Sequence, residues 1–169
     1  MKEEILTSVR VFTGHINMPE GFEINKNEIG KEILSSSILK TSFPFMREID
    51  KIDTYLREYI YLDYKIWLVQ KNINGLVFLP NDHSDNQLEI DKMDLKNSCD
   101  YVMFYGVHIN DDSFKIKIEF DDNRRKTNYK EIILHNNDFV IFPSSQRYSI
   151  LENTSNSPNI ALIGTYEYM

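Results

Sequence analysis

Residues 114–120 read FKIKIEF, and this stretch decides the fold class of the chain. Apolar and polar residues alternate at every position, which predicts a β-strand with one buried and one solvated face. Other short apolar runs lie behind turn signals at fairly regular spacing: residues 65–69, 75–79, 101–107, 131–134, 139–142 and 160–166. The first two of these runs flank an Asn-Ile-Asn-Gly sequence that predicts a turn. Regularly spaced short strands favour an antiparallel sandwich or jelly roll over residues 64–169.

The segment before residue 64 has a different periodicity. Residues 45–61 (FMREIDKIDTYLREYIY) carry apolar residues three and four positions apart, which predicts an amphipathic helix. A second helix is expected over residues 25–39, with Asn25 or Asn27 as its N-cap. Residues 5–12 alternate as a strand does. We therefore expect one domain, mainly β, in which an N-terminal strand and two helices (residues 1–63) precede a jelly-roll core and the helices pack on one sheet.

Composition narrows the functional classes. A chain of 169 residues with 12% aromatic residues can bury a sizeable core, which excludes a disordered tail. The net charge of −7 argues against nucleic acid and anionic membranes as partners, and no apolar run reaches the about 18 residues of a membrane span. The single cysteine, Cys99, fits a reducing compartment, so the expected location is cytoplasmic. One alanine against 16 asparagines and 21 isoleucines indicates an AT-rich coding sequence, and hence a small genome or its phage.

Histidine and carboxylate spacing offers one candidate metal site. His83 and Asp85 follow the strand-like residues 75–79 as a His-x-Asp pair. Side chains two positions apart on a strand point to the same face, so both could bind one ion. With a distant third ligand, such a pair forms the facial triad of non-haem Fe(II) oxygenases. The alternative interpretation is a solvated loop in which Asp85 caps a turn.

The order of segments resembles the short 2-oxoglutarate/Fe(II)-dependent oxygenases. The tryptophan strand with Trp67, the His83 loop, the aromatic run YVMFYGV (residues 101–107) and DFVIFPSSQRYSI (residues 138–150) follow one another as in that family. DFVIFPS is the most specific part. The resemblance implies a double-stranded β-helix fold, and for an active protein Fe(II) and 2-oxoglutarate as cofactors. It also implies His83, Asp85 and Tyr148 as the metal ligands, because the position of the family's distal histidine falls at Tyr148 or next to it at Arg147.

The chain departs from the family at two functional positions. No histidine follows His135, so a phenol replaces the distal imidazole at Tyr148. The last strand should carry an arginine that binds the keto acid, yet residues 159–169 contain neither Arg nor Lys. Loss of that arginine removes a bidentate carboxylate partner that other side chains do not replace. We expect a protein that keeps the fold of this family without its catalytic activity, and we assign no catalytic residue.

Three functions from different classes follow from these observations. The preferred one is a non-catalytic structural or interaction module that binds protein partners or itself, in a phage particle or the host cytoplasm. Its ten tyrosines suit protein interfaces. The first alternative is an active Fe(II)/2-oxoglutarate oxygenase with an unorthodox site. The second alternative is a cupin-like domain that binds a small ligand at the mouth of the roll.

Overall fold

The computed structural model describes residues 9–123 and 126–169. Within these ranges the chain forms two helices and eight strands. In chain order they are β1 (Phe12–His15), α1 (Lys26–Leu39), α2 (Arg47–Tyr64), β2 (Leu68–Phe78), β3 (Tyr101–His108), β4 (Lys115–Asn123), β5 (Lys126–Ile133), β6 (Asp138–Pro143), β7 (Tyr148–Ile150) and β8 (Asn159–Tyr168).

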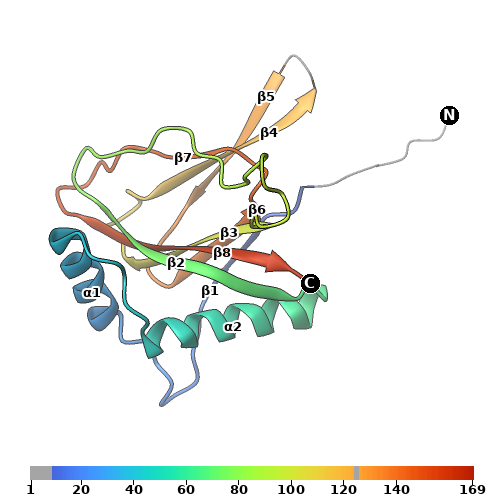
Figure 1. The fold of residues 1–169 in the computed structure, drawn as a ribbon. Coiled ribbons are helices and arrows are strands. Elements are labelled where there is room, and N and C mark those ends of the chain that lie inside the picture. Colours follow the sequence, from blue (N-terminus) through green and yellow to red (C-terminus); the bar gives the residue numbers. More distant parts are fainter. Residues whose placement is uncertain (1–8, 124–125) are drawn as a thin grey trace.

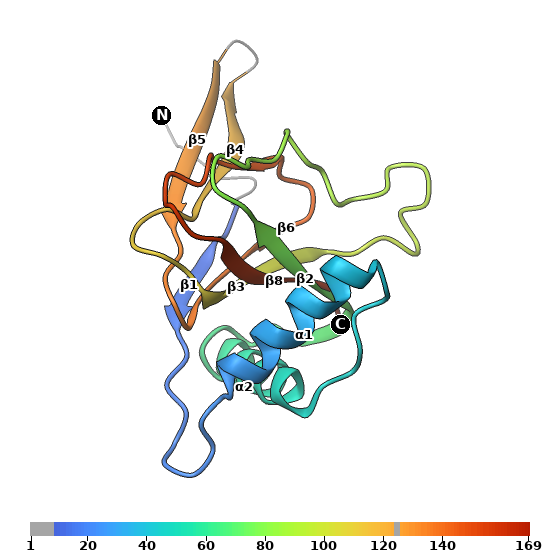
Figure 2. The same ribbon diagram turned by 90° about the vertical axis from the view of Figure 1, so that its left-hand side faces the viewer.

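The strands form two antiparallel sheets. The larger has the order β1-β6-β3-β8-β2, and the smaller has the order β5-β4-β7. Figure 1 shows both helices on one side of the five-stranded sheet and the smaller sheet on the other side, and Figure 2 shows the same layers after a quarter turn. Strands that are neighbours in a sheet are rarely neighbours in the chain, as in a jelly roll. The predicted mainly β architecture, a double-stranded β-helix with two helices on one sheet, is confirmed.

The five-stranded sheet is buried on both faces. In β3, Met103 and Tyr105 contact the core beneath the helices, whereas Val102 and Phe104 contact the core between the two sheets. All four side chains are fully buried. A central strand with two apolar faces gives an uninterrupted hydrophobic run in sequence, as the YVMFYGV segment does. In β4 of the smaller sheet, buried side chains alternate with partly solvent-exposed ones, because only one face of that sheet is covered.

The predicted α2 packing is confirmed. Its apolar stripe faces the larger sheet and is almost completely buried: Ile49, Ile52, Leu56 and Ile60. The helix begins at Arg47 rather than at residue 45, and Phe45 lies outside it with 89% of its surface exposed. In α1 the N-cap is Asn25, whose side-chain oxygen accepts the backbone N–H of Glu28 at 3.2 Å. Neither helix of the described ranges is long and apolar enough to cross a membrane.

The predicted Asn-Ile-Asn-Gly turn is wrong. Residues 72–75 lie inside β2, which runs unbroken along β8, with a register shift between Gln70 and Asn72. The glycine serves close packing instead, since a Cβ at Gly75 would lie 2.5 Å from a side-chain carbon of Ile33 in α1. The register shift at Lys71 precedes these residues, and Asn72 to Gly75 pair one by one with Thr165 to Leu162 of β8, so the turn-forming residues do not reverse the chain.

The first strand also differs from its predicted position. Residues 5–8 of the expected 5–12 strand lie outside the described residues, and the observed β1 pairs Phe12 with Ile141 and His15 with Asp138 of β6. The register is set by this distant partner, which local alternation does not reveal. Because β1 extends the larger sheet, the N-terminal segment contributes directly to the jelly roll.

Truncation of the α2 stripe should destabilise the protein strongly. Leu56→Ala removes a side chain with 0% exposure between α2 and the larger sheet, and we expect a loss of about 2–5 kcal/mol in the free energy of unfolding. Leu62→Ala, on the exposed side of the same helix, should cost less than about 0.5 kcal/mol. Denaturant unfolding of both variants measures the difference. Equal losses would contradict the packing described here.

Candidate functional site

The predicted ligands His83 and Asp85 lie in the irregular segment that follows β2. Both are exposed, and neither side chain hydrogen-bonds to another described residue. Ser84 between them is held firmly: its backbone N–H donates to the carbonyl of Ile150 at 3.0 Å, and its hydroxyl accepts the Ile150 N–H at 2.8 Å. The backbone of the His-x-Asp segment therefore lies beside β7, the strand that carries the third predicted ligand.

Tyr148, that third ligand, is buried at the start of β7. Its ring packs edge-on against Phe104 and Phe142, with centroid distances of 5.3 and 5.4 Å. Its hydroxyl donates a 2.6 Å hydrogen bond to Oε1 of Glu89. Burial, and then the hydrogen bond to the Glu89 carboxylate, raise the pKa of Tyr148. The phenol is therefore held in its protonated form and becomes available to a metal only if its hydroxyl leaves Glu89.

The space between the two sheets is filled by a tightly packed cluster. Besides Tyr148, it contains Val102, Phe104, Phe114, Ile116, Ile118, Val140, Phe142, Ile150 and Ala161, all nearly inaccessible to solvent. The last strand, β8, contributes only the small Ala161 to the buried part of this cluster. The inter-sheet face of β8 thus offers no cation for a keto acid.

The segment that carries His83 and Asp85 thus lies beside the strand of Tyr148, but the three side chains are not brought into one coordination sphere. Two members face solvent, and the third is buried and already hydrogen-bonded. Among residues 9–123 and 126–169, no three His, Cys, Asp or Glu side chains are grouped so that they could hold a metal ion. The arrangement does not fit a facial triad as it stands, and the ligand set stays a prediction.

A chain of titratable groups that the sequence did not indicate joins β1, the β3–β4 connection and β6. Asp138 accepts from Nδ1 of His15 at 2.7 Å and from Nδ1 of His135 at 2.9 Å. Nε2 of His135 lies 2.9 Å from Asp112. Hydrogen bonds to Asp112 and Asp138 raise the pKa of His135. The groups satisfy one another, so we interpret the chain as a cross-brace at one edge of the roll.

Solved structures resemble this architecture closely. A Pseudomonas putida prolyl-4-hydroxylase aligns with a TM-score of 0.67 at 11% identity, covering 94% of this chain and 88% of the hydroxylase. The epimerase SnoN, solved with Fe3+, alpha ketoglutarate and nogalamycin RO, aligns with a TM-score of 0.64 at 8% identity, covering 93% of this chain and 78% of SnoN. The fold is that of the 2-oxoglutarate/Fe(II) oxygenases.

The likeness to the oxygenase fold is found at very low sequence identity. A 2OG-Fe(II) oxygenase family member from Burkholderia pseudomallei also aligns, with a TM-score of 0.51 at 8% identity, covering 73% of this chain and 61% of that protein. No protein-family model and no curated protein matches the sequence. At such identities the similarity to the oxygenases concerns the fold alone. Whether the protein has catalytic activity depends on its own side chains.

The cross-brace should make stability depend on pH. Because the folded-state pKa of His135 is raised, its contribution is complete below about pH 6.5 and is lost as the pH rises through the folded pKa. Burial acts to raise the pKa of Asp138, but hydrogen bonds from the two histidines lower it overall, so its contribution is lost only as the pH falls through that lowered value.

We therefore expect His135→Gln to destabilise the protein more at about pH 5.5 than at about pH 8.5, measured by denaturant unfolding at both values. The matched control is His83→Gln, at an exposed histidine with no carboxylate partner among the described residues, and it should show no such pH dependence. A His135→Gln penalty that grows as the pH rises would refute the cross-brace.

Proposed function

We propose that this protein is a non-catalytic relative of the oxygenases that acts through contacts with protein chains, including copies of itself. The observation that carries the proposal is the state of Tyr148. Where the family's distal ligand is expected, a buried phenol packs against Phe104 and Phe142 and donates a hydrogen bond to Glu89. Releasing it would leave Glu89 without its partner and open a packed core. Both changes cost free energy.

The missing arginine supports the same conclusion. A hydrogen bond to a charged group contributes about 1.5–3 kcal/mol, so loss of a bidentate keto-acid partner weakens binding by about tenfold or more. The only residue of β8 buried in the inter-sheet cluster is Ala161, which cannot compensate. A site of this kind lacks an anchor for the co-substrate as well as an available third metal ligand.

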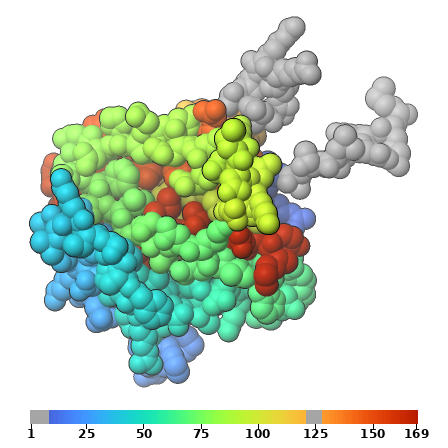
Figure 3. All heavy atoms as spheres, viewed as in Figure 1, coloured from blue at the N-terminus to red at the C-terminus, as the bar shows by residue number. Residues whose placement is uncertain are grey.

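An exposed apolar surface supports the contact role. Ile38 and Leu39 at the end of α1 are largely exposed, and Phe45 in the segment joining the helices is 89% exposed. We call these three residues the apolar end. Figure 1 shows that the end of α1 and the start of α2 lie at separate points joined by an extended segment, and Figure 3 shows this segment, in cyan, on the surface at the left of the molecule. A phenylalanine almost fully in water is costly unless it meets a partner, so the apolar end suits a contact between copies.

Residue usage bears on the setting. The excess of asparagine and isoleucine over alanine is typical of AT-rich phage genomes, and a contact module of this size suits a phage particle. A symmetric assembly is the usual form of such self-contact.

The alternative function is an active oxygenase that uses His83, Asp85 and Tyr148 as ligands, with Fe(II) and 2-oxoglutarate as cofactors. The observation that favours it is the pair of hydrogen bonds between Ser84 and Ile150, which place the His-x-Asp backbone beside β7. When bound, iron would supply oxygen activation. Use of this site requires the Tyr148 hydroxyl to leave Glu89 and both exposed side chains to turn inward.

Turnover separates the two functions. We expect the purified protein, given Fe(II), 2-oxoglutarate and oxygen, to form no more succinate than its His83→Ala variant. That variant should unfold at the same denaturant concentration as the wild type, since the exposed His83 contacts no described hydrogen-bond partner. Iron-dependent succinate formation that His83→Ala abolishes would overturn the non-catalytic proposal.

The oligomeric state tests the contact surface. We expect sedimentation velocity to detect self-association, and Phe45→Ser to weaken it by about tenfold or more, because removal of a central aromatic anchor typically has such an effect. Met93→Ser is the control, since Met93 is 95% exposed in a different loop. A strictly monomeric wild-type protein, or equal effects of the two substitutions, would show that the apolar end does not join copies.

A further inference from the structure

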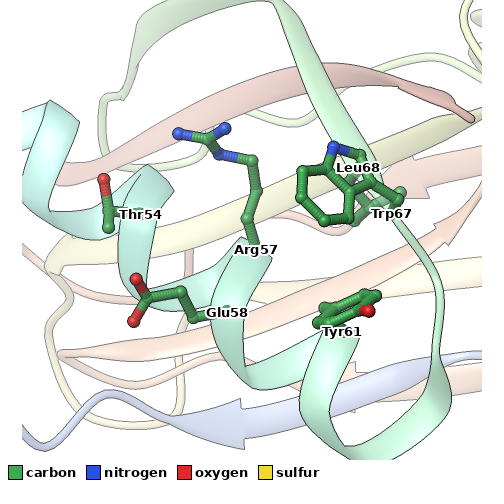
Figure 4. A pocket seen from close by; sticks show the side chains of 6 residues that line it. All are labelled: Thr54, Arg57, Glu58, Tyr61, Trp67 and Leu68. Carbon is green, nitrogen blue, oxygen red and sulfur yellow. The ribbon is translucent and has the colours of Figure 1, made fainter.

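A small pocket lies outside the roll, between the second half of α2 and the start of β2. It encloses about 210 Å³ and is lined by Thr54, Arg57, Glu58, Tyr61, Trp67 and Leu68. Figure 4 shows that it has two unlike sides: the polar ends of Thr54, Arg57 and Glu58 gather on one, and the two aromatic rings form the other. Its volume is below the about 300 Å³ at which pockets for drug-sized ligands begin, so its ligand is no larger than a fragment.

Arg57 is positioned on the polar side by a buried carboxylate. Its Nε lies 2.7 Å from Oδ2 of Asp53, one helical turn earlier, and Asp53 is only 5% exposed. No described residue accepts a hydrogen bond from the terminal nitrogens of Arg57. The contact is an ion pair without hydrogen-bond geometry at the buried Nε. Asp53 thus holds the guanidinium by charge at one edge, and its terminal nitrogens stay open to the pocket, an arrangement suited to a carboxylate.

The buried polar groups around Asp53 that lie beneath Arg57 reduce the stability of the fold. Oδ1 of Asp53, Nε of Arg57 and the hydroxyl of Tyr166 are all buried, and none of them has a hydrogen-bond partner among the described residues. Burial raises the pKa of Asp53 even though the Arg57 guanidinium acts to lower it. Buried polar groups that remain unsatisfied are rare and call for an explanation. Presentation of a charged group to a ligand is such an explanation.

The aromatic side is rigid and partly open. The rings of Tyr61 and Trp67 meet edge to face, with centroids 5.1 Å apart, and Leu68 forms a buried floor. Trp67 keeps 49% of its surface exposed, although burial of an indole is strongly favourable. Its exposed face can therefore take up an apolar group without any rearrangement of the core.

Both signs of charge border the polar side. Arg57 carries the positive charge, and the neighbouring exposed Glu58 carries a carboxylate for which no ion pair is found among the described residues. A simple anion would leave Glu58 unused and repelled, and a simple cation would meet Arg57. A ligand with an anionic and a cationic group on adjacent atoms satisfies both.

We propose that this pocket binds a free α-amino acid with an apolar side chain. The carboxylate of the ligand lies on Arg57 and the hydroxyl of Thr54, and its ammonium group lies on Glu58. The apolar side chain packs on Trp67 and Tyr61. This inference concerns a site outside the roll and does not depend on whether the protein is catalytic.

The test uses the only tryptophan of the chain as a probe. Trp67 lines the pocket, so the intrinsic emission of the full protein reports ligand binding at that position. L-leucine should change the emission saturably. Leucinamide lacks the carboxylate and 4-methylpentanoate lacks the ammonium group, and each should bind about tenfold or more weakly than leucine.

One exposed substitution isolates the ammonium contact without risk to the fold. Glu58→Gln should weaken leucine binding about fivefold or more while binding of 4-methylpentanoate stays unchanged, because that compound has no ammonium group. Glu152→Gln, at an exposed glutamate far from the pocket lining in sequence, should change neither. Saturable binding with this pattern supports the proposal. The absence of a saturable change up to about 10 mM leucine, or equal affinity for all three compounds, would overturn it.

Discussion

Burial of the five-stranded sheet on both faces is the constraint on which the rest of the structure depends. Neighbouring residues of β3 point into different cores: Met103 and Tyr105 beneath the helices, Val102 and Phe104 between the sheets. The helices and the smaller sheet are therefore both required, because each covers a face that cannot meet water. The same constraint divides possible sites into two kinds. One lies inside the roll, where apolar packing competes with any ligand, and the other lies where a helix meets the rim of the sheet.

Much of the architecture could be predicted from sequence because its signals are local. The apolar stripe of α2, the alternation in β4 and the hydrophobic run of β3 each report burial directly. Prediction was wrong where pairing with a strand distant in sequence determines the local structure. Turn-forming residues near Gly75 remain in a strand because β8 pairs along them and Ile33 packs above. The position of β1 is set by β6, more than a hundred residues away.

The candidate site shows the same division. The family register proposed His83, Asp85 and Tyr148 as one ligand set, and the hydrogen bonds between Ser84 and Ile150 bring the His83 segment beside β7, the strand of Tyr148. Sequence could not indicate that Glu89 holds the Tyr148 hydroxyl, since the two residues are 59 positions apart and no motif joins them. The same holds for His15 of β1, which pairs with Asp138 across 123 positions. Pairings of this kind depend on the register of strands, and register is a property of the assembled sheets.

The place of β8 in the larger sheet has a consequence for how the chain folds. β8 lies between β2 and β3, although both precede it by dozens of residues, so those two strands never become neighbours. Until β8 inserts, each presents a row of unpaired backbone groups of the kind that recruits other chains. Topologies dominated by such distant pairings fold slowly. During synthesis, β2 and β3 therefore each expose an unpaired edge until β8 is available to pair with them. The risk of aggregation is highest in that interval, and binding by a chaperone protects the chain most at that stage.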